Sequence, residues 1–192
     1  VAEEVTIGGA DLPDVAGEEL TVLLDQLLAL RDLVVEVANM GIPDSLFMRV
    51  LQYGLPLEPD ALRGEGLASA FTEHMREGGY TVELVSERDE TADSEALETE
   101  ARLYVRFVDA NNHVLRLGVE FFNSKRYRRG MELLLKIRER CPGPVYTIRH
   151  KDAELEAVSL FDLLRQVLDL AQKGVNVQRY KGLGEMNPEQ LW

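Results

Sequence analysis

The sequence predicts an α+β fold in which helices pack on a mostly antiparallel sheet built from hairpins. Two observations predict it. Apolar residues recur at steps of three and four over several long stretches, which is the period of a helix with one buried face. Elsewhere apolar and polar residues alternate in short paired runs joined by turn residues, which is typical of hairpins. The 192 residues, 45% of them apolar, are enough to bury a core.

The first part of the chain predicts one short strand followed by three helices. The strand covers residues 4–7, and the long helix after it carries apolar residues at helical spacing from Leu20 to Val37. A glycine and a proline end that helix, and residues 43–45 begin the second. The third lies within residues 60–79, where internal glycines weaken it and a glycine pair ends it. We expect these apolar stripes to form the core against a sheet.

The middle of the chain predicts β-structure around an acidic loop. Residues 80–85 alternate as a strand does, whereas residues 87–100 hold almost no apolar side chains and predict a long mobile loop. The runs 102–108 and 113–119 flank a turn-forming Asp-Ala-Asn-Asn and predict a hairpin. Three arginines fall on its predicted solvent face: Arg102, Arg106 and Arg116. A solvated sheet face, pairing with the acidic half of the chain, or contact with a nucleic acid would each explain them.

A helix with a basic start follows. Asn123 or Ser124 can cap it, and its first turn contains Lys125, Arg126, Arg128 and Arg129. On a helical period Lys125, Arg129, Lys136 and Arg140 share one stripe, opposite Tyr127, Met131 and Leu134. Cations at a helix start oppose the helix dipole, at a cost of ~0.3–1 kcal/mol each. We therefore expect negative charge nearby, which could be DNA or the acidic first half of the chain.

The last predicted elements are a hairpin, a helix and a strand. Residues 145–150 and 155–158 form the hairpin around a turn at 151–154. Ser159 caps a helix with a continuous apolar stripe, and a glycine at position 174 ends it. From residue 175 the chain alternates again and predicts a final strand.

Charge is distributed unevenly along the chain. The net charge is −13, but residues 1–100 carry −18 and residues 101–192 carry +5. The acidic half should repel a polyanion, so only the basic half could approach one. The single cysteine, Cys141, allows no internal disulfide, and no Cys/His pair has the spacing of a zinc site. No run of apolar residues is long enough to span a membrane. We expect a cytoplasmic protein and, because the chain opens at Val1 without a methionine, an excised fragment.

The carboxyl-terminal stretch is the segment that packing alone explains least well. Its strand leads into a basic turn at 179–181 with two glycines, and Asn-Pro-Glu-Gln at 187–190 starts a helix. A dinucleotide-binding fingerprint would need a third glycine at Asn187, and a P-loop would need Gly-Lys rather than Lys-Gly. The residues themselves leave two interpretations, a basic surface turn and a loop that faces a phosphate.

Residues 178–192, Gln-Arg-Tyr-Lys-Gly-Leu-Gly-Glu-Met-Asn-Pro-Glu-Gln-Leu-Trp, resemble the signature near the end of the TOPRIM region in the DNA gyrase B subunit family. Residues 119–164 resemble, more weakly, the region that leads into that signature. The resemblance implies an insertion domain of the TOPRIM region over residues 1–174, followed by the C-terminal strand and turn of that region over residues 175–192.

For the whole protein, the resemblance implies a type IIA topoisomerase that drives negative DNA supercoiling with ATP and Mg²⁺, in an A2B2 complex with the gyrase A subunit. We expect no catalytic, cofactor-binding or metal residues in this fragment, because it lacks the Asp-x-Asp of the family's Mg²⁺ site. Its three histidines also sit in no catalytic arrangement. The fragment would then support DNA binding and subunit assembly. Two alternatives remain: a non-catalytic protein-interaction domain, and the B-type subunit of topoisomerase IV.

The resemblance also suggests where DNA would bind. In the family the lysine of Tyr-Lys-Gly-Leu-Gly lies close to DNA, which transfers to Lys181, and Arg179 stands beside it. The basic helix start adds Lys125, Arg126, Arg128 and Arg129 as candidates on charge alone.

Overall fold

The computed structural model describes most of the chain as two compact units. It describes residues 5–8, 14–54, 67–87, 102–143, 145–151 and 153–174, with the side chains of the last helix described through residue 172. Unit 1 comprises residues 1–21 and 143–192, and unit 2 comprises residues 22–142. Both contain helices and antiparallel strands, which confirms the predicted α+β class. The predicted loop covers residues 87–100, but Glu87 ends a strand and pairs with Arg102; residues 88–100 and the predicted strand from residue 175 lie outside the described residues.

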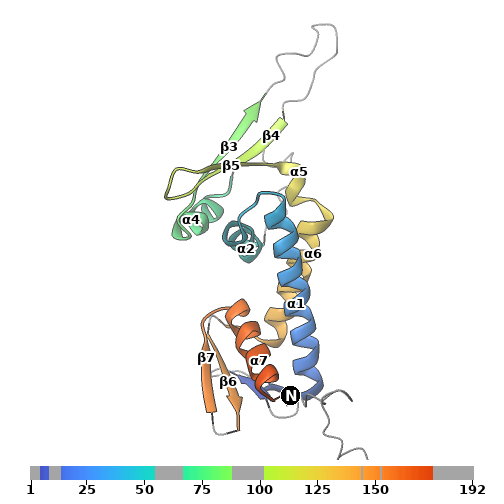
Figure 1. Cartoon of the computed structure of the whole chain (residues 1–192). Coiled ribbons are helices and arrows are strands. Elements are labelled where there is room, and N and C mark those ends of the chain that lie inside the picture. Colours follow the sequence, from blue (N-terminus) through green and yellow to red (C-terminus); the bar gives the residue numbers. More distant parts are fainter. Residues whose placement is uncertain are drawn as a thin grey trace, which may run out of the picture. The chain divides into compact units, whose positions relative to one another are not determined.

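Unit 1 contains a sheet with the strand order β2-β1-β6-β7. Its strands are β1 (Val5–Gly8), β2 (Val15–Ala16), β6 (Tyr146–His150) and β7 (Ala153–Ala157). Helix α7 (Leu160–Gly174) lies against β6 and β7 (Figure 1). Leu163 in its apolar stripe is fully buried. Strand β1 pairs with β6, so the sheet joins an early segment of the chain to a late one.

The hairpin in unit 1 has a shorter turn than the sequence predicts. The predicted turn covers 151–154, but His150 pairs directly with Ala153, so β7 begins two residues earlier than predicted. Lys151 adopts a left-handed conformation with φ of 54°. Two-residue hairpins need this conformation because it matches the twist of the strands. The prediction missed it because lysine, unlike Asn or Gly, does not indicate such a turn.

Unit 2 contains most of helix α1 (Gly17–Asn39) and all elements from α2 to α6. These are α2 (Asp44–Tyr53), α4 (Ser69–Glu77), β3 (Thr81–Glu87), β4 (Arg102–Val108), β5 (Val114–Gly118), α5 (Val119–Phe122) and α6 (Lys125–Arg140). The predicted helical stripe from Leu20 to Val37 is confirmed, because most of its apolar residues are buried in α1, although Leu24 is partly exposed. Residues 55–66, the start of the third predicted segment, lie outside the described ranges.

The sheet of unit 2, in the order β3-β4-β5, has one buried and one polar face. Val105 and Phe107 are buried, whereas Arg106 between them points to the other face and pairs with Glu83 at 2.9 Å. Arg116 on β5 pairs in the same way with Glu87. Pairing with acidic residues therefore explains two of the three arginines that the sequence placed on this face.

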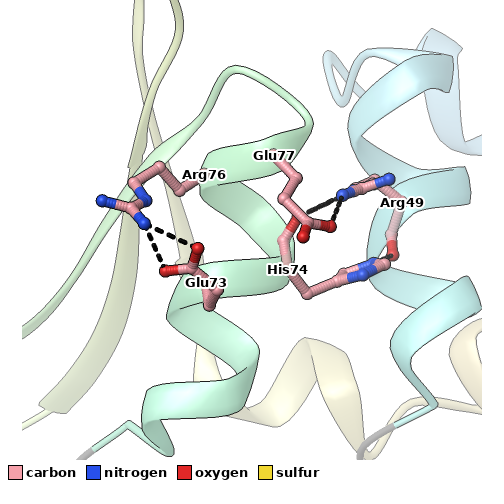
Figure 2. A network of polar contacts seen from close by, with 5 residues as sticks. All are labelled: Arg49, Glu73, His74, Arg76 and Glu77. Carbon is pink, nitrogen blue, oxygen red and sulfur yellow. Dashed lines mark hydrogen bonds and ion pairs between the residues drawn. The ribbon is translucent and has the colours of Figure 1, made fainter.

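Helices α2 and α4 are joined by a reciprocal pair of side-chain contacts, shown in Figure 2. The Nε of Arg49 donates to the His74 carbonyl at 2.9 Å, and the His74 ring Nε2 lies 2.9 Å from the Arg49 carbonyl. Arg49 also reaches Glu77 at 3.2 Å. Since each side chain satisfies the other residue's backbone, this pair fixes the two helices together and accounts for a histidine that would otherwise suggest a site.

Helix α6 packs unusually closely on its neighbours at a glycine. A Cβ placed on Gly130 would lie 2.9 and 3.0 Å from the two terminal methyl groups of Leu51 and 3.4 Å from one of Leu33. Leu51 belongs to α2 and Leu33 to α1, so the missing side chain allows three helices to meet.

Candidate nucleic-acid interface

The basic helix start is anchored by a cap and an aromatic cluster. The backbone N–H of Tyr127 donates to Ser124 Oγ at 3.2 Å, which selects Ser124 over Asn123 as the capping residue. The Tyr127 ring is buried against Phe121 and Phe122, with ring centroids 6.1 and 5.6 Å away. Burial raises the pKa of the Tyr127 hydroxyl above its ordinary value, so this ring stays neutral. These contacts fix the direction of the first helical turn.

The four cations of that turn are all exposed, but they differ in their partners. The Nε of Arg126 lies 2.5 Å from the Glu36 carboxylate on α1. Within the described residues, Lys125, Arg128 and Arg129 form no ion pair. The acidic first half therefore neutralises one of the four. Three positive charges remain at the helix end where the dipole is also positive.

The rest of α6 follows the predicted two-sided pattern. Lys125, Arg129 and Lys136 are exposed on the basic stripe, and Arg140 at its end is half-buried. On the opposite side Tyr127 and Leu134 are buried, and Met131 is partly buried. Sequence reasoning missed Gly130 and Ile137 as members of the buried side, although their spacing from Leu134 could have indicated both.

A shallow hollow of about 240 Å³ lies beside the first turns of α6. Phe122, Asn123, Tyr127, Arg128, Met131 and Glu132 line it. Phe122 and Tyr127 are buried, whereas Arg128 and Glu132 are exposed and carry opposite charges. The hollow therefore places apolar side chains beside one positive and one negative group.

The two candidates with the strongest basis in sequence, Lys181 and Arg179, lie outside the described residues. Their role in DNA binding stays a prediction.

The other polar groups of the described ranges have structural roles. Asp109 caps the β4–β5 turn by accepting the N–H groups of Asn111 and His113, each at 2.8 Å, and its carboxylate also meets the His113 ring. The backbone N–H of His113 is the main reason why the pKa of Asp109 is below its ordinary value. In these ranges no three His, Cys, Asp or Glu side chains gather as a metal site would need. None of the helices described there has both the length and the apolar character of a membrane span.

Comparison with known proteins identifies relatives that match parts of the chain. The family model "DNA gyrase B subunit, carboxyl terminus" matches residues 172–192. The B subunit of the type 2 topoisomerase of Aquifex aeolicus is 42% identical over 76 residues, which cover 40% of this chain and 9% of that protein. The DNA gyrase B subunit of Caulobacter vibrioides is 46% identical over 65 residues, which cover 34% of this chain and 8% of that protein. The DNA gyrase B subunit of Campylobacter jejuni is 56% identical over 43 residues, which cover 22% of this chain and 6% of that protein. The matched segments thus span less than a tenth of these relatives. This chain is thus similar in part to DNA gyrase B subunits, and its residues 172–192 match the carboxyl terminus of that subunit family.

Proposed function

We propose that this chain is a non-catalytic part of the B subunit of a type IIA DNA topoisomerase, and that it supports DNA binding and subunit assembly. The observation that carries the proposal is the family match over residues 172–192. In this proposal residues 1–174 form an insertion domain of the TOPRIM region and residues 175–192 its last strand and turn. The complete protein would be cytoplasmic and would supercoil DNA negatively with ATP and Mg²⁺, in an A2B2 complex with a gyrase A subunit.

DNA contact is proposed at two places. One is the basic turn with Lys181 and Arg179, by analogy with the family. The other is the start of α6, where Lys125, Arg128 and Arg129 are exposed and form no ion pair among the described residues. Arg126 is a weaker candidate, because its guanidinium already contacts Glu36.

Charge-changing variants of the complete B subunit, assembled with its A subunit, test these contacts separately. Lys181→Ala should weaken DNA binding equally for all sequences, and the slope of log K against log salt should fall by about 0.9, the value for one phosphate contact. Lys125→Glu combined with Arg129→Glu should weaken binding more, because two attractions become repulsions. The double change Lys136→Glu and Arg140→Glu is the matched control on the same helix. If the Lys125/Arg129 variant binds DNA normally but is less stable, the helix start serves the fold instead.

The competing proposal is a protein-interaction domain that contacts no DNA. Three ion pairs within unit 2 join an arginine from the second half of the chain to an acid from the first half, and they favour this proposal because they show that such arginines have protein partners. DNA affinity that is unchanged in both the Lys181 and the Lys125/Arg129 variants would support it. Topoisomerase IV is the nearer alternative, and a supercoiling assay with the complete enzyme tests it, because the proposal for gyrase requires negative supercoiling.

A further inference from the structure

Strand β5 forms one border of the sheet in unit 2, and within the described residues its outer edge pairs with no strand (Figure 1). The N–H of Asp109 donates to the carbonyl of His113 at 3.1 Å, so these two residues are the hydrogen-bonded pair that closes the β4–β5 hairpin. Hydrogen-bonded and unbonded pairs alternate along an antiparallel ladder. The backbone N–H and C=O groups of Val114 and Arg116 therefore point away from β4, toward the free edge. An edge of this kind can accept one further strand.

A hollow of about 340 Å³ lies beside this edge, between the sheet and the start of α2. Pro43 and Leu46 line it from the α2 side, and Phe107 and Leu115 line it from the sheet. Leu115 pairs with the buried Phe107, so both side chains lie on the face of the sheet that meets the hollow. The hollow therefore offers apolar contacts directly beside the strand edge.

Hydrogen bonds fix two of the segments around the hollow. Ser45 Oγ on α2 lies 2.9 Å from the hydroxyl of Tyr80, the residue before β3. At the hairpin, Asp109 accepts the N–H groups of Asn111 and His113, each at 2.8 Å. Because its own turn satisfies the Asp109 carboxylate, this group does not require a cation in the hollow. The hollow is thus preformed, as ligand-binding sites commonly are.

The side chains along the edge favour an uncharged occupant. The Arg116 guanidinium reaches across β4 to Glu87 on β3, so its charge is directed away from the edge. Val114, on the same face as Arg116, is 50% exposed, and Leu115 on the other face is partly exposed. A strand placed beside β5 would therefore cover apolar side chains on both faces of the sheet.

We propose that the edge of β5 and the hollow together bind an extended segment of a partner protein, which adds a strand beside β5 and places one large apolar side chain in the hollow. The backbone of the segment would bond to Val114 and Arg116, which supplies affinity for an extended chain of any sequence. The hollow would select the side chain beside Leu115, since paired residues of neighbouring strands lie on the same face. The site contains no residue of the α6 start, so its test is independent of the proposed DNA contact.

Short peptides of serine and threonine with one guest residue in the middle are the probes, and the amide NMR signals of the full chain are the readout. The peptide with a phenylalanine guest should shift the signals of Val114, Leu115 and Arg116. It should bind about tenfold more tightly than the peptide with an alanine guest, because the hollow removes apolar surface from water. A lysine guest should bind no better than alanine. Equal affinity for the phenylalanine and alanine peptides, or no shift of these amides at millimolar peptide, would overturn the proposal.

Two substitutions of Arg116 test the strand pairing. Arg116→Pro removes an N–H of the free edge and leaves the bonds to β4, because that N–H points away from β4. Arg116→Ala is the matched control, since both changes lose the contact with Glu87. The alanine variant should bind the phenylalanine peptide as the unchanged chain does, and the proline variant about tenfold more weakly. Amide exchange in β4 shows whether the sheet is intact, and equal binding by the two variants would contradict the pairing.

Two substitutions of Ser45 test the hollow without changing the strand. Ser45 is exposed on α2, and Ser45→Phe should fill the hollow and abolish the preference for the phenylalanine peptide over the alanine peptide. Ser45→Ala, which also loses the contact with the Tyr80 hydroxyl, should keep this preference. An unchanged preference in Ser45→Phe would refute the role of the hollow. A dimer of the chain that protects the amides of Val114 and Arg116 from exchange would also overturn the proposal, because a second copy would then occupy the edge.

Discussion

Replacing Gly130 with alanine tests the closest helix contact in unit 2. At an exposed position inside a helix, glycine-to-alanine stabilises by about 1 kcal/mol. At Gly130 the added methyl group would lie 2.9 and 3.0 Å from the two Leu51 methyl groups. Carbon atoms prefer separations of about 3.5–4.0 Å, so Leu51 or the helix must move. Leu51 is only 2% exposed, so its methyl groups can move only against other buried groups.

The magnitude follows from the balance of these two effects. Overpacking of a core costs about 1–3 kcal/mol, which exceeds the helical gain. Gly130→Ala should therefore lower the free energy of unfolding by about 0–2 kcal/mol. The expected sign is opposite to that of the same change on the helix surface.

Urea denaturation followed by circular dichroism measures the change, with amide exchange in α6 reporting on this unit alone. Lys136 is exposed on the same helix. The difference in the free energy of unfolding between Lys136→Ala and Lys136→Gly therefore measures how much alanine stabilises this helix relative to glycine when no packing is involved. In a Leu51→Ala background, which is itself destabilised, Gly130→Ala should become neutral or stabilising, because the obstructing methyl groups are gone. If Gly130→Ala alone stabilises by the full amount measured at position 136, the close packing is refuted.

Three further predictions use single groups. A hydrogen bond from Arg165 is the main cause that lowers the pKa of Asp162. The ionised carboxylate therefore stabilises the fold at pH values above its pKa in the unfolded chain, and this contribution is lost as the pH falls through its lower pKa in the folded chain. Asp162→Asn should lower the stability at pH 7 and flatten the acid side of a curve of stability against pH. Cys141 should react with iodoacetamide far more slowly at pH 8 in the folded chain than in urea, because burial raises its pKa to about 11. A double-mutant cycle of Arg126→Ala and Glu36→Ala should give a coupling of only about 0.2–1 kcal/mol, because both side chains are 49% exposed, and a larger value would contradict this expectation.

The elements that were predictable from the sequence are those defined by local signals. The stripe of α1, the hairpin at 102–118 and the Ser159 cap each depend on residues within one element or turn, and the structure confirms them. The Ser159 hydroxyl accepts the N–H of Asp162 at 3.1 Å, as a capping residue should. Periodicity reveals which face of an element is buried and needs no knowledge of its partner.

The partners themselves were not predictable in this way. Strand β1 pairs with β6 across about 140 residues of sequence, and nothing in Val5–Gly8 indicates which strand it joins. The division of the strands into two sheets was not predictable either, because no local signal indicates which strands pair. Gly130 looked like a weak position in a helix, and only the neighbouring Leu51 and Leu33 show that the absence of a side chain is required there.

The ion pairs show how the opposite charges of the −18 half and the +5 half are partly balanced within the fold. Arg126 pairs with Glu36, Arg106 with Glu83, Arg116 with Glu87 and Arg149 with Asp14, and in each pair the cation comes from the second half and the acid from the first. These partly exposed pairs add little stability, but they remove arginines from the set available to a polyanion. Among the described cations of the α6 start, Lys125, Arg128 and Arg129 remain without such a pair. A DNA contact at the start of α6 should therefore depend on these three residues more than on Arg126, whose charge is already balanced within the fold.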